Sequence, residues 1–117
     1  MSTLATKSRF GKLISRGRIQ RLADEIAQAF SPSRIILFGS YATGKADPDS
    51  DVDLLVLFRT RKPRDMSLRI RRRIEWRSAL DLIVMDEARL AKRISWGDFF
   101  LIDIMESGKV LYESAHA

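Results

Sequence analysis

Apolar residues recur along the chain with two periods, one typical of helices and one typical of strands. Between residues 17 and 30 they repeat every three or four positions, which predicts an amphipathic helix that ends at Ser31-Pro32-Ser33. Short apolar runs at 34–38 and 79–85 predict buried strands. Residues 51–58 begin with alternation and become wholly apolar, so they predict a further strand.

The second half of the chain continues with mostly helical patterns. A helix of about twelve residues is expected around Met66, and Asp86 is placed to cap a short helix after the 79–85 strand. Residues 96–107 predict another helix. We expect Gly108 to close that helix in a left-handed conformation, and residues 109–112 to form a last short strand.

The predicted order is helix, strand, strand, helix, strand, helix, helix, strand, with a short helical turn at 41–45 after the first strand. This order indicates an α/β fold in which helices pack on a small mixed β-sheet. The 117 residues suit a single domain. We divide them into a flexible basic arm at 1–16, which lacks acidic residues, and a folded domain at 17–117.

The composition restricts the chemistry that the chain can perform. Cysteine is absent and the only histidine is His116, which argues against disulfides, zinc sites and a histidine general base. Catalysis would therefore depend on carboxylates and a hard, oxygen-preferring cation. No apolar run approaches the roughly 20 residues of a membrane-spanning helix, and no secretory signal pattern is found, so the expected location is cytoplasmic.

One stretch combines a phosphate-binding pattern with paired carboxylates. A predicted strand runs into Gly39-Ser40, where the missing Cβ, the exposed amides and the hydroxyl suit a phosphate group. Asp51 and Asp53 follow after ten residues, and alternation places them on one side of the next strand. At that spacing the two carboxylates can share two divalent cations with a triphosphate.

Asp81 is a candidate third carboxylate for the same site. It lies near the start of the apolar segment 79–85, and a buried strand does not easily accommodate an unpaired carboxylate. If this strand lies beside that of Asp53, Asp81 can ligate a metal and accept the proton of an attacking hydroxyl.

This stretch resembles the pattern of the DNA polymerase β-like nucleotidyltransferase superfamily. That pattern is an apolar residue followed by Gly-Ser, then about ten residues, then Asp-apolar-Asp. The chain is similar to the minimal members of that superfamily from about Ile19 to Glu113. The resemblance implies a magnesium-dependent transfer of a nucleoside monophosphate from a nucleoside triphosphate, ATP being the first expectation, with release of pyrophosphate. It also implies that Gly39 and Ser40 hold phosphates, and that Asp51, Asp53 and Asp81 hold two magnesium ions and serve catalysis.

The nucleotide-binding end departs from the pattern of that superfamily. Its members often have Gly-Ser-x-Ala-Arg-Gly, whereas Thr43 stands here in place of the arginine, and Lys45 is the candidate replacement as a phosphate-binding cation. A P-loop is an alternative reading of Gly39 to Lys45. It fails at Ala46, where a serine or threonine should reach magnesium.

Basic residues dominate the chain, which has a net charge of +6 and an isoelectric point near 10.2. Nine of them lie between Arg59 and Arg77, against only Asp65 and Glu75. The region predicts a surface for RNA, DNA or an acidic protein face, and a solvated helix surface is the alternative. The two tryptophans, Trp76 and Trp96, are assigned to core or interface packing.

Two hypotheses of function follow. In the first, the chain is an enzyme that acts on a macromolecular acceptor, and the resemblance implies the antitoxin of a pair with a HEPN-type RNase toxin, a tyrosine of the toxin being the acceptor. In the second, it is a catalytically weak binding module that neutralises a partner protein or binds nucleic acid through the region 59–77.

Overall fold

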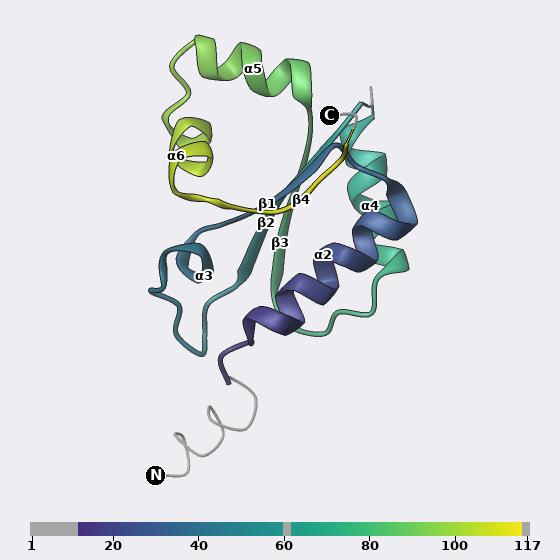
Figure 1. The fold of residues 1–117 in the computed structure, drawn as a ribbon, viewed down its shortest axis with the longest axis vertical. Helices are drawn as coiled ribbons and strands as arrows, with labels where there is room; N and C mark the ends of the chain where they lie inside the picture. The colour runs from purple at the N-terminus through teal and green to yellow at the C-terminus, as the bar shows by residue number, and fades with distance from the viewer. Residues whose placement is uncertain (1–11, 60–61, 116–117) are drawn as a thin grey trace.

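One mixed four-stranded sheet organises the fold and runs through the centre of Figure 1, with helices on both sides of it. Its strands are β1 (Arg34–Phe38), β2 (Val52–Phe58), β3 (Leu80–Asp86) and β4 (Lys109–Glu113), in the spatial order β3-β2-β1-β4. β1 is antiparallel to both β2 and β4, whereas β2 is parallel to β3. The predicted small mixed α/β fold is confirmed.

This computed structural model describes residues 12–59 and 62–115. Most of the predicted basic arm, Arg61 and His116 therefore lie outside the described residues. No helix of the described part is long and apolar enough to cross a membrane.

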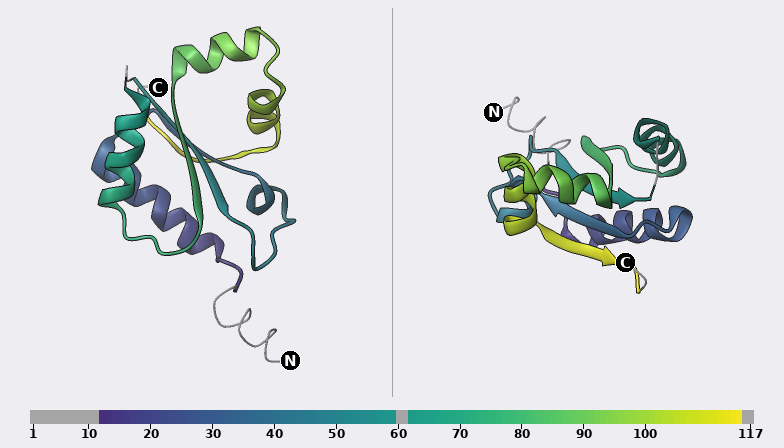
Figure 2. Two further views of the ribbon diagram at one scale, coloured as in Figure 1. Left: turned by 180° about the vertical axis from the view of Figure 1, so that it is seen from behind. Right: turned by 90° about the horizontal axis from the view of Figure 1, so that it is seen from above.

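The helices cover the two faces of the sheet. α2 (Arg16–Phe30) and α4 (Pro63–Arg73) lie on one face, and α5 (Glu87–Ser95) and α6 (Phe99–Ser107) lie on the other, as Figures 1 and 2 show. The short helix α3 (Ser40–Thr43) follows directly after β1 at one end of the sheet. Both faces of the central strands are thus shielded from solvent.

Alternation along β2 divides the core into two layers. Leu54 and Val56 face the α2 and α4 side, whereas Leu55 and Leu57 face the α5 and α6 side, and all four are fully buried. Burial on both faces explains why this strand is wholly apolar after Asp53.

Side-chain caps determine where several helices begin. Asp86 caps α5 by accepting a hydrogen bond from the amide of Ala88 at 2.7 Å, as the sequence predicted. Asp98 caps α6 in the same way, accepting from the amide of Leu101 at 3.1 Å. The predicted start of that helix at residue 96 is therefore wrong, because Gly97, with φ of 84°, forms a turn before the cap.

Gly108 follows α6, but its predicted left-handed conformation is also wrong. Its backbone is extended, with φ of −75° and ψ of 166°. A Cβ at this position would overlap the carbonyl oxygen of Ile104 and lie 2.8 Å from Cγ2 of Ile36. Close packing of the chain against β1, rather than a left-handed turn, requires glycine here.

An ion pair joins the start of β1 to α5. Arg34 donates hydrogen bonds to both carboxylate oxygens of Glu87, at 2.7 and 3.0 Å, and the Ser33 hydroxyl donates another at 2.8 Å. The hydrogen bond from Arg34 is the main cause that lowers the pKa of Glu87, and the bond from Ser33 acts in the same direction. The pair fixes α5 over the end of the sheet opposite to α3.

Candidate active site

Gly39 forms the sharp corner between β1 and α3. Its φ of 74° and ψ of −156° lie in a region that L side chains rarely adopt. A Cβ on Gly39 would overlap Oδ2 of Asp53 and approach its Cγ to 3.1 Å. Glycine is therefore required both for the turn and for the close approach of the backbone to the Asp53 carboxylate.

Strand register brings two of the predicted carboxylates together. Asp53 in β2 is the direct partner of Asp81 in the parallel strand β3, and of Phe38 in the antiparallel strand β1. Alternation sets Asp53 on the same face as Leu55 and Leu57, which is the face that α5 and α6 cover further along the sheet. The condition on which the role of Asp81 depended, that its strand lies beside the strand of Asp53, is met.

The three carboxylates differ in exposure. Asp53 is half-buried, whereas Asp51, which precedes the first residue of β2, is exposed. Asp81 is also exposed, because β3 forms an edge of the sheet. The prediction that Asp81 belongs to a buried strand is wrong, although its place beside Asp53 follows from the register.

Crowding of negative charge perturbs Asp53. Its pKa is raised from 3.8 to about 6, first by burial and then by the charges of Asp81 and Asp51, with a hydrogen bond to Asp81 acting in the same direction. A raised pKa means that the ionised form of this carboxylate is disfavoured in the folded chain. A positively charged ligand at this end of the sheet would relieve that cost.

Magnesium fits the donor chemistry of this cluster. The side chains are carboxylates, the hard oxygen donors that Mg²⁺ prefers, and the raised pKa of Asp53 marks the charge that a divalent cation would neutralise. Within residues 12–59 and 62–115, no group of three acidic or histidine side chains is gathered closely enough to enclose an ion. Magnesium commonly completes its coordination with water and substrate phosphates, so such a cage is not required.

The predicted phosphate-binding residues lie around α3. Ser40 is its first residue, and the amides at positions 40 and 41 have no acceptor within so short a helix. Lys45 is exposed just beyond the C-terminal cap, and its amide donates to the carbonyl of Ser40 at 2.9 Å. Thr43, which replaces the arginine of the resembling pattern, is exposed on the same turn.

The P-loop alternative is wrong. A P-loop connects a parallel strand to a helix in a βαβ unit, whereas both neighbours of β1 are antiparallel and α3 has only four residues.

Aromatic side chains beside the carboxylates were missed by the sequence analysis. Phe100 packs edge-on against Phe38, with ring centroids 5.7 Å apart and an interplanar angle of 89°. Of the two places predicted for Trp96, core or interface, its 70% exposure excludes the core, whereas Trp76 packs against the core as predicted. The run of Trp, Gly, Asp, Phe and Phe at 96–100 was the available signal, but it was absorbed into a predicted helix.

A small mixed sheet with an aspartate pair across β2 and β3, beside a Gly-Ser turn at the end of β1, defines the nucleotidyltransferase class. Residues 19–111 match the nucleotidyltransferase domain family, and the chain belongs to that family. It is an enzyme of the nucleotidyltransferase type.

One relative and two solved structures are similar to the chain to different degrees. A Methanocaldococcus jannaschii protein named as a candidate protein adenylyltransferase is 33% identical over 79 residues, covering 68% of this chain and 77% of that protein. The crystal structure of a candidate nucleotidyltransferase from Sulfolobus solfataricus superposes with a TM-score of 0.59 at 20% identity, covering 97% of this chain and 88% of the other. A toxin–antitoxin structure with AMP-PNP gives a TM-score of 0.43 at 18% identity, covering 83% and 75%.

Proposed function

We propose that this nucleotidyltransferase transfers AMP from ATP to a hydroxyl group of a protein. The observation that carries the proposal is the register pair Asp53 and Asp81, set against Gly39 at one end of the sheet. The choice of AMP and of a protein acceptor is supported by the likeness to a protein named as a candidate protein adenylyltransferase.

The three carboxylates have separate roles in this proposal. Asp51, Asp53 and Asp81 would hold magnesium, which supplies charge neutralisation for the triphosphate when it is bound. The strand β2 and the close contact with Gly39 fix the carboxylate of Asp53, so this residue would fix the position of the bound magnesium. Asp81 is exposed at a sheet edge, where the hydroxyl of a protein acceptor can reach it. It would receive the proton of that hydroxyl.

The phosphate end of the nucleotide would lie over α3. Amides at the start of this helix and the Ser40 hydroxyl are hydrogen-bond donors, and Lys45 adds a positive charge near the opposite end of the turn. Attack of the acceptor oxygen on the α-phosphorus forms the new P–O bond, and the bond to the β-phosphate oxygen breaks to release pyrophosphate. Positioning and charge neutralisation supply the rate enhancement.

A HEPN-type toxin is the acceptor that we propose. This part of the proposal rests on the resemblance of the sequence to antitoxin nucleotidyltransferases, with a toxin tyrosine as the modified residue. The cytoplasm is the proposed location, since both proteins of such a pair would meet there.

The test is incubation of the purified chain with a HEPN-type toxin, magnesium and each of four nucleoside triphosphates labelled on the α-phosphate. We expect label on the toxin from ATP, and its loss on addition of a chelator. Asp53→Asn and Asp81→Asn should each reduce transfer by at least about 100-fold, as expected for groups that act on the transition state. The matched control is Asp103→Asn, an exposed aspartate on α6, which should leave transfer unchanged. Absence of label with all four nucleotides would overturn the proposal.

Nucleic-acid binding through the arginine-rich helix α4 is a second candidate function. Arg69, Arg72 and Arg73 line a 400 Å³ hollow between α4 and the end of α2, on the sheet face opposite to the carboxylates. Only part of this charge is neutralised internally, by the ion pair between Nη1 of Arg73 and Oε2 of Glu25 at 3.4 Å. The guanidinium carbon of Arg69 lies over the Phe30 ring, 6.0 Å from its centroid.

Salt dependence tests this second function. Binding of a fluorescent single-stranded RNA should weaken steeply as salt increases, and Arg72→Glu should weaken it further while leaving AMP transfer intact. The same affinity for wild type and for Arg72→Glu would exclude α4 as the binding surface.

A further inference from the structure

The end of α5 and the start of α6 expose three aromatic side chains, Trp96, Phe99 and Phe100, which we name the aromatic corner. The exposed fractions are 70% for Trp96, 85% for Phe99 and 55% for Phe100. Isolated apolar residues are common on protein surfaces, whereas here three large aromatic side chains within five positions of the chain are exposed. Exposed apolar surface of this kind marks sites of interaction with other molecules.

The aromatic corner is continuous with the carboxylate site. Phe100 contacts Phe38 edge-on, and Phe38 is the register partner of Asp53 in the neighbouring strand. Phe38 also belongs to the core layer under α5 and α6, as do the β2 residues that alternate in phase with Asp53. The corner and the carboxylates therefore lie on one face of the sheet, with Phe38 between them.

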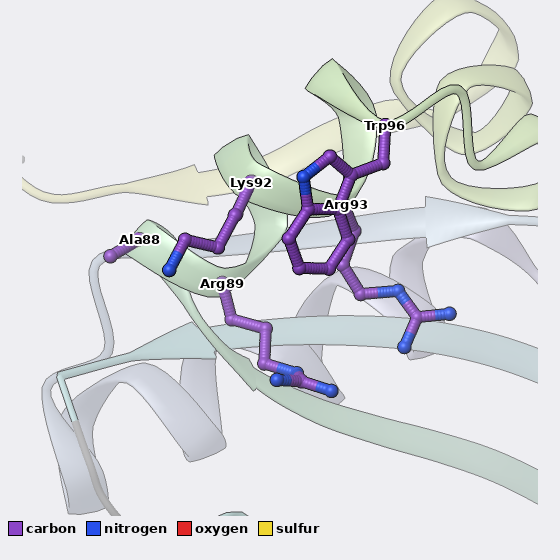
Figure 3. A pocket seen from close by; sticks show the side chains of 5 residues that line it. All are labelled: Ala88, Arg89, Lys92, Arg93 and Trp96. Atoms are coloured by element: carbon purple, nitrogen blue, oxygen red, sulfur yellow. The ribbon is translucent and has the colours of Figure 1, made fainter.

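Positive charge borders the aromatic corner. Trp96 closes a 190 Å³ pocket on α5 whose other walls are Ala88, Arg89, Lys92 and Arg93, as Figure 3 shows. Arg93 is neutralised by Asp98, with hydrogen bonds of 2.7 and 2.9 Å. Across residues 12–59 and 62–115, neither Arg89 nor Lys92 forms an ion pair, so these two cations remain available to an acidic partner.

We propose that the aromatic corner and this cationic pocket are the docking surface for the protein acceptor of the transferred nucleotide. The occupant is a segment that presents an apolar side chain flanked by aspartate or glutamate, with its hydroxyl directed along the sheet face toward Asp53. This inference rests on the proposed function, because it assigns the surface that its protein acceptor would contact.

The shape and charge of the surface favour a protein over other occupants. Small ligands occupy concave sites that bury most of their surface, whereas Phe99 protrudes with 85% of its area exposed, so the adenine base does not suit it. Exposed tryptophan, phenylalanine and arginine are the residue types enriched at protein interfaces. A second copy of this chain that paired through the same surface would bring Arg89 and Lys92 against like charges, so an acidic partner is favoured.

Peptide binding to the full chain tests the docking surface without requiring catalysis. The probes are two fluorescent peptides with a central tyrosine beside phenylalanine, one with glutamate flanks and the other with lysine flanks. We expect the glutamate peptide to bind at least about 10-fold more tightly, because charge complementarity discriminates between them. Phe99→Ala and Arg89→Glu should each weaken its binding by about 10- to 30-fold, as at interface hot spots.

Matched controls lie on the opposite face of the sheet. Leu68→Ala removes another exposed apolar side chain, and Arg72→Glu reverses another exposed charge, both on α4, and neither should alter peptide binding. Equal binding of the two peptides, or equal losses in the control variants, would overturn the inference. Weaker binding of ATP rather than of peptide in Phe99→Ala would also overturn it, since it would assign the corner to the nucleotide.

Catalysis provides a separate readout. In the absence of peptide, water can attack the α-phosphorus of ATP to give AMP and pyrophosphate, and this slow release should be the same in wild type and in Phe99→Ala. If wild type releases no pyrophosphate with or without a HEPN-type toxin, the proposed function fails. If pyrophosphate is released but peptide binding does not depend on the corner, only the docking inference fails.

Discussion

Replacing Asp53 by asparagine should stabilise the magnesium-free protein at neutral pH, even though it removes a carboxylate of the proposed active site. The pKa of Asp53 is raised from 3.8 to about 6 by burial and by its neighbours Asp81 and Asp51. Above the folded pKa, the chain therefore holds an ionised carboxylate that is more stable in the unfolded state. Asparagine keeps the shape of the side chain and removes this charge.

The size of the effect follows from the pKa. A rise from 3.8 to about 6 corresponds to roughly 3 kcal/mol at 1.36 kcal/mol per pKa unit. Asp53 is only half-buried, and solvent screening reduces this to about 1–2 kcal/mol. Because the folded pKa is raised, the free energy of unfolding falls as pH rises from 3.8 to about 6, and the full cost is present above that interval.

Urea denaturation of wild type and Asp53→Asn in a chelator measures this directly. At about pH 7.5 the variant should be more stable by the amount above, and at about pH 4 most of the difference should disappear, since Asp53 is then protonated in the folded chain. Magnesium should raise the stability of wild type more than that of the variant. Asp103→Asn is the control and should show no such pH dependence. If Asp53→Asn is neutral or destabilising at neutral pH, the account of crowded charge is wrong.

Three further predictions, one of them with Gly97→Ala as its comparison, test how the fold is held together. Glu87→Gln should lower the free energy of unfolding by about 1–2 kcal/mol, between the values for exposed and buried ion pairs, because it weakens the half-buried pair with Arg34. Since the folded pKa of Glu87 is lowered, wild type should lose this advantage as pH falls below 4.5, measured by urea denaturation across pH. Gly108→Ala should destabilise by more than about 2 kcal/mol because its Cβ meets backbone, whereas Gly97→Ala, with open space around it, should cost only about 1 kcal/mol for its positive φ. Leu55→Ala should cost about 2–5 kcal/mol in thermal or urea unfolding, since this side chain is fully buried, and a smaller loss would contradict the two-layer core.

The chain is too short to enclose a large acceptor around its carboxylates. The carboxylates lie at the end of the sheet where α3 begins, and Asp51 and Asp81 are exposed there while Asp53 is half-buried. An acceptor therefore has direct access from solvent to Asp81. This openness agrees with a macromolecular acceptor, which brings its own surface to complete the site.

Local sequence patterns were sufficient for most of the secondary structure. Helical spacing located α2, apolar runs located β1 and β2 to within one residue, and Asp86 was recognised as the cap of α5. They failed at the start of α6. The turn at Gly97 and the cap at Asp98 lie between apolar residues, and the apolar pattern at 96–100 does not show where the helix begins.

The sequence by itself determined which residue types were available to the site: glycine, serine and three aspartates at fixed spacing, with no cysteine and no internal histidine. Only the tertiary structure decided that Asp81 lies in register with Asp53, because strand neighbours are chosen by long-range pairing rather than by local propensity. It also decided that Gly108 serves close packing and that Trp96 is exposed, since burial depends on contacts between segments far apart in the chain. The aromatic corner beside Phe38 exists only through those contacts.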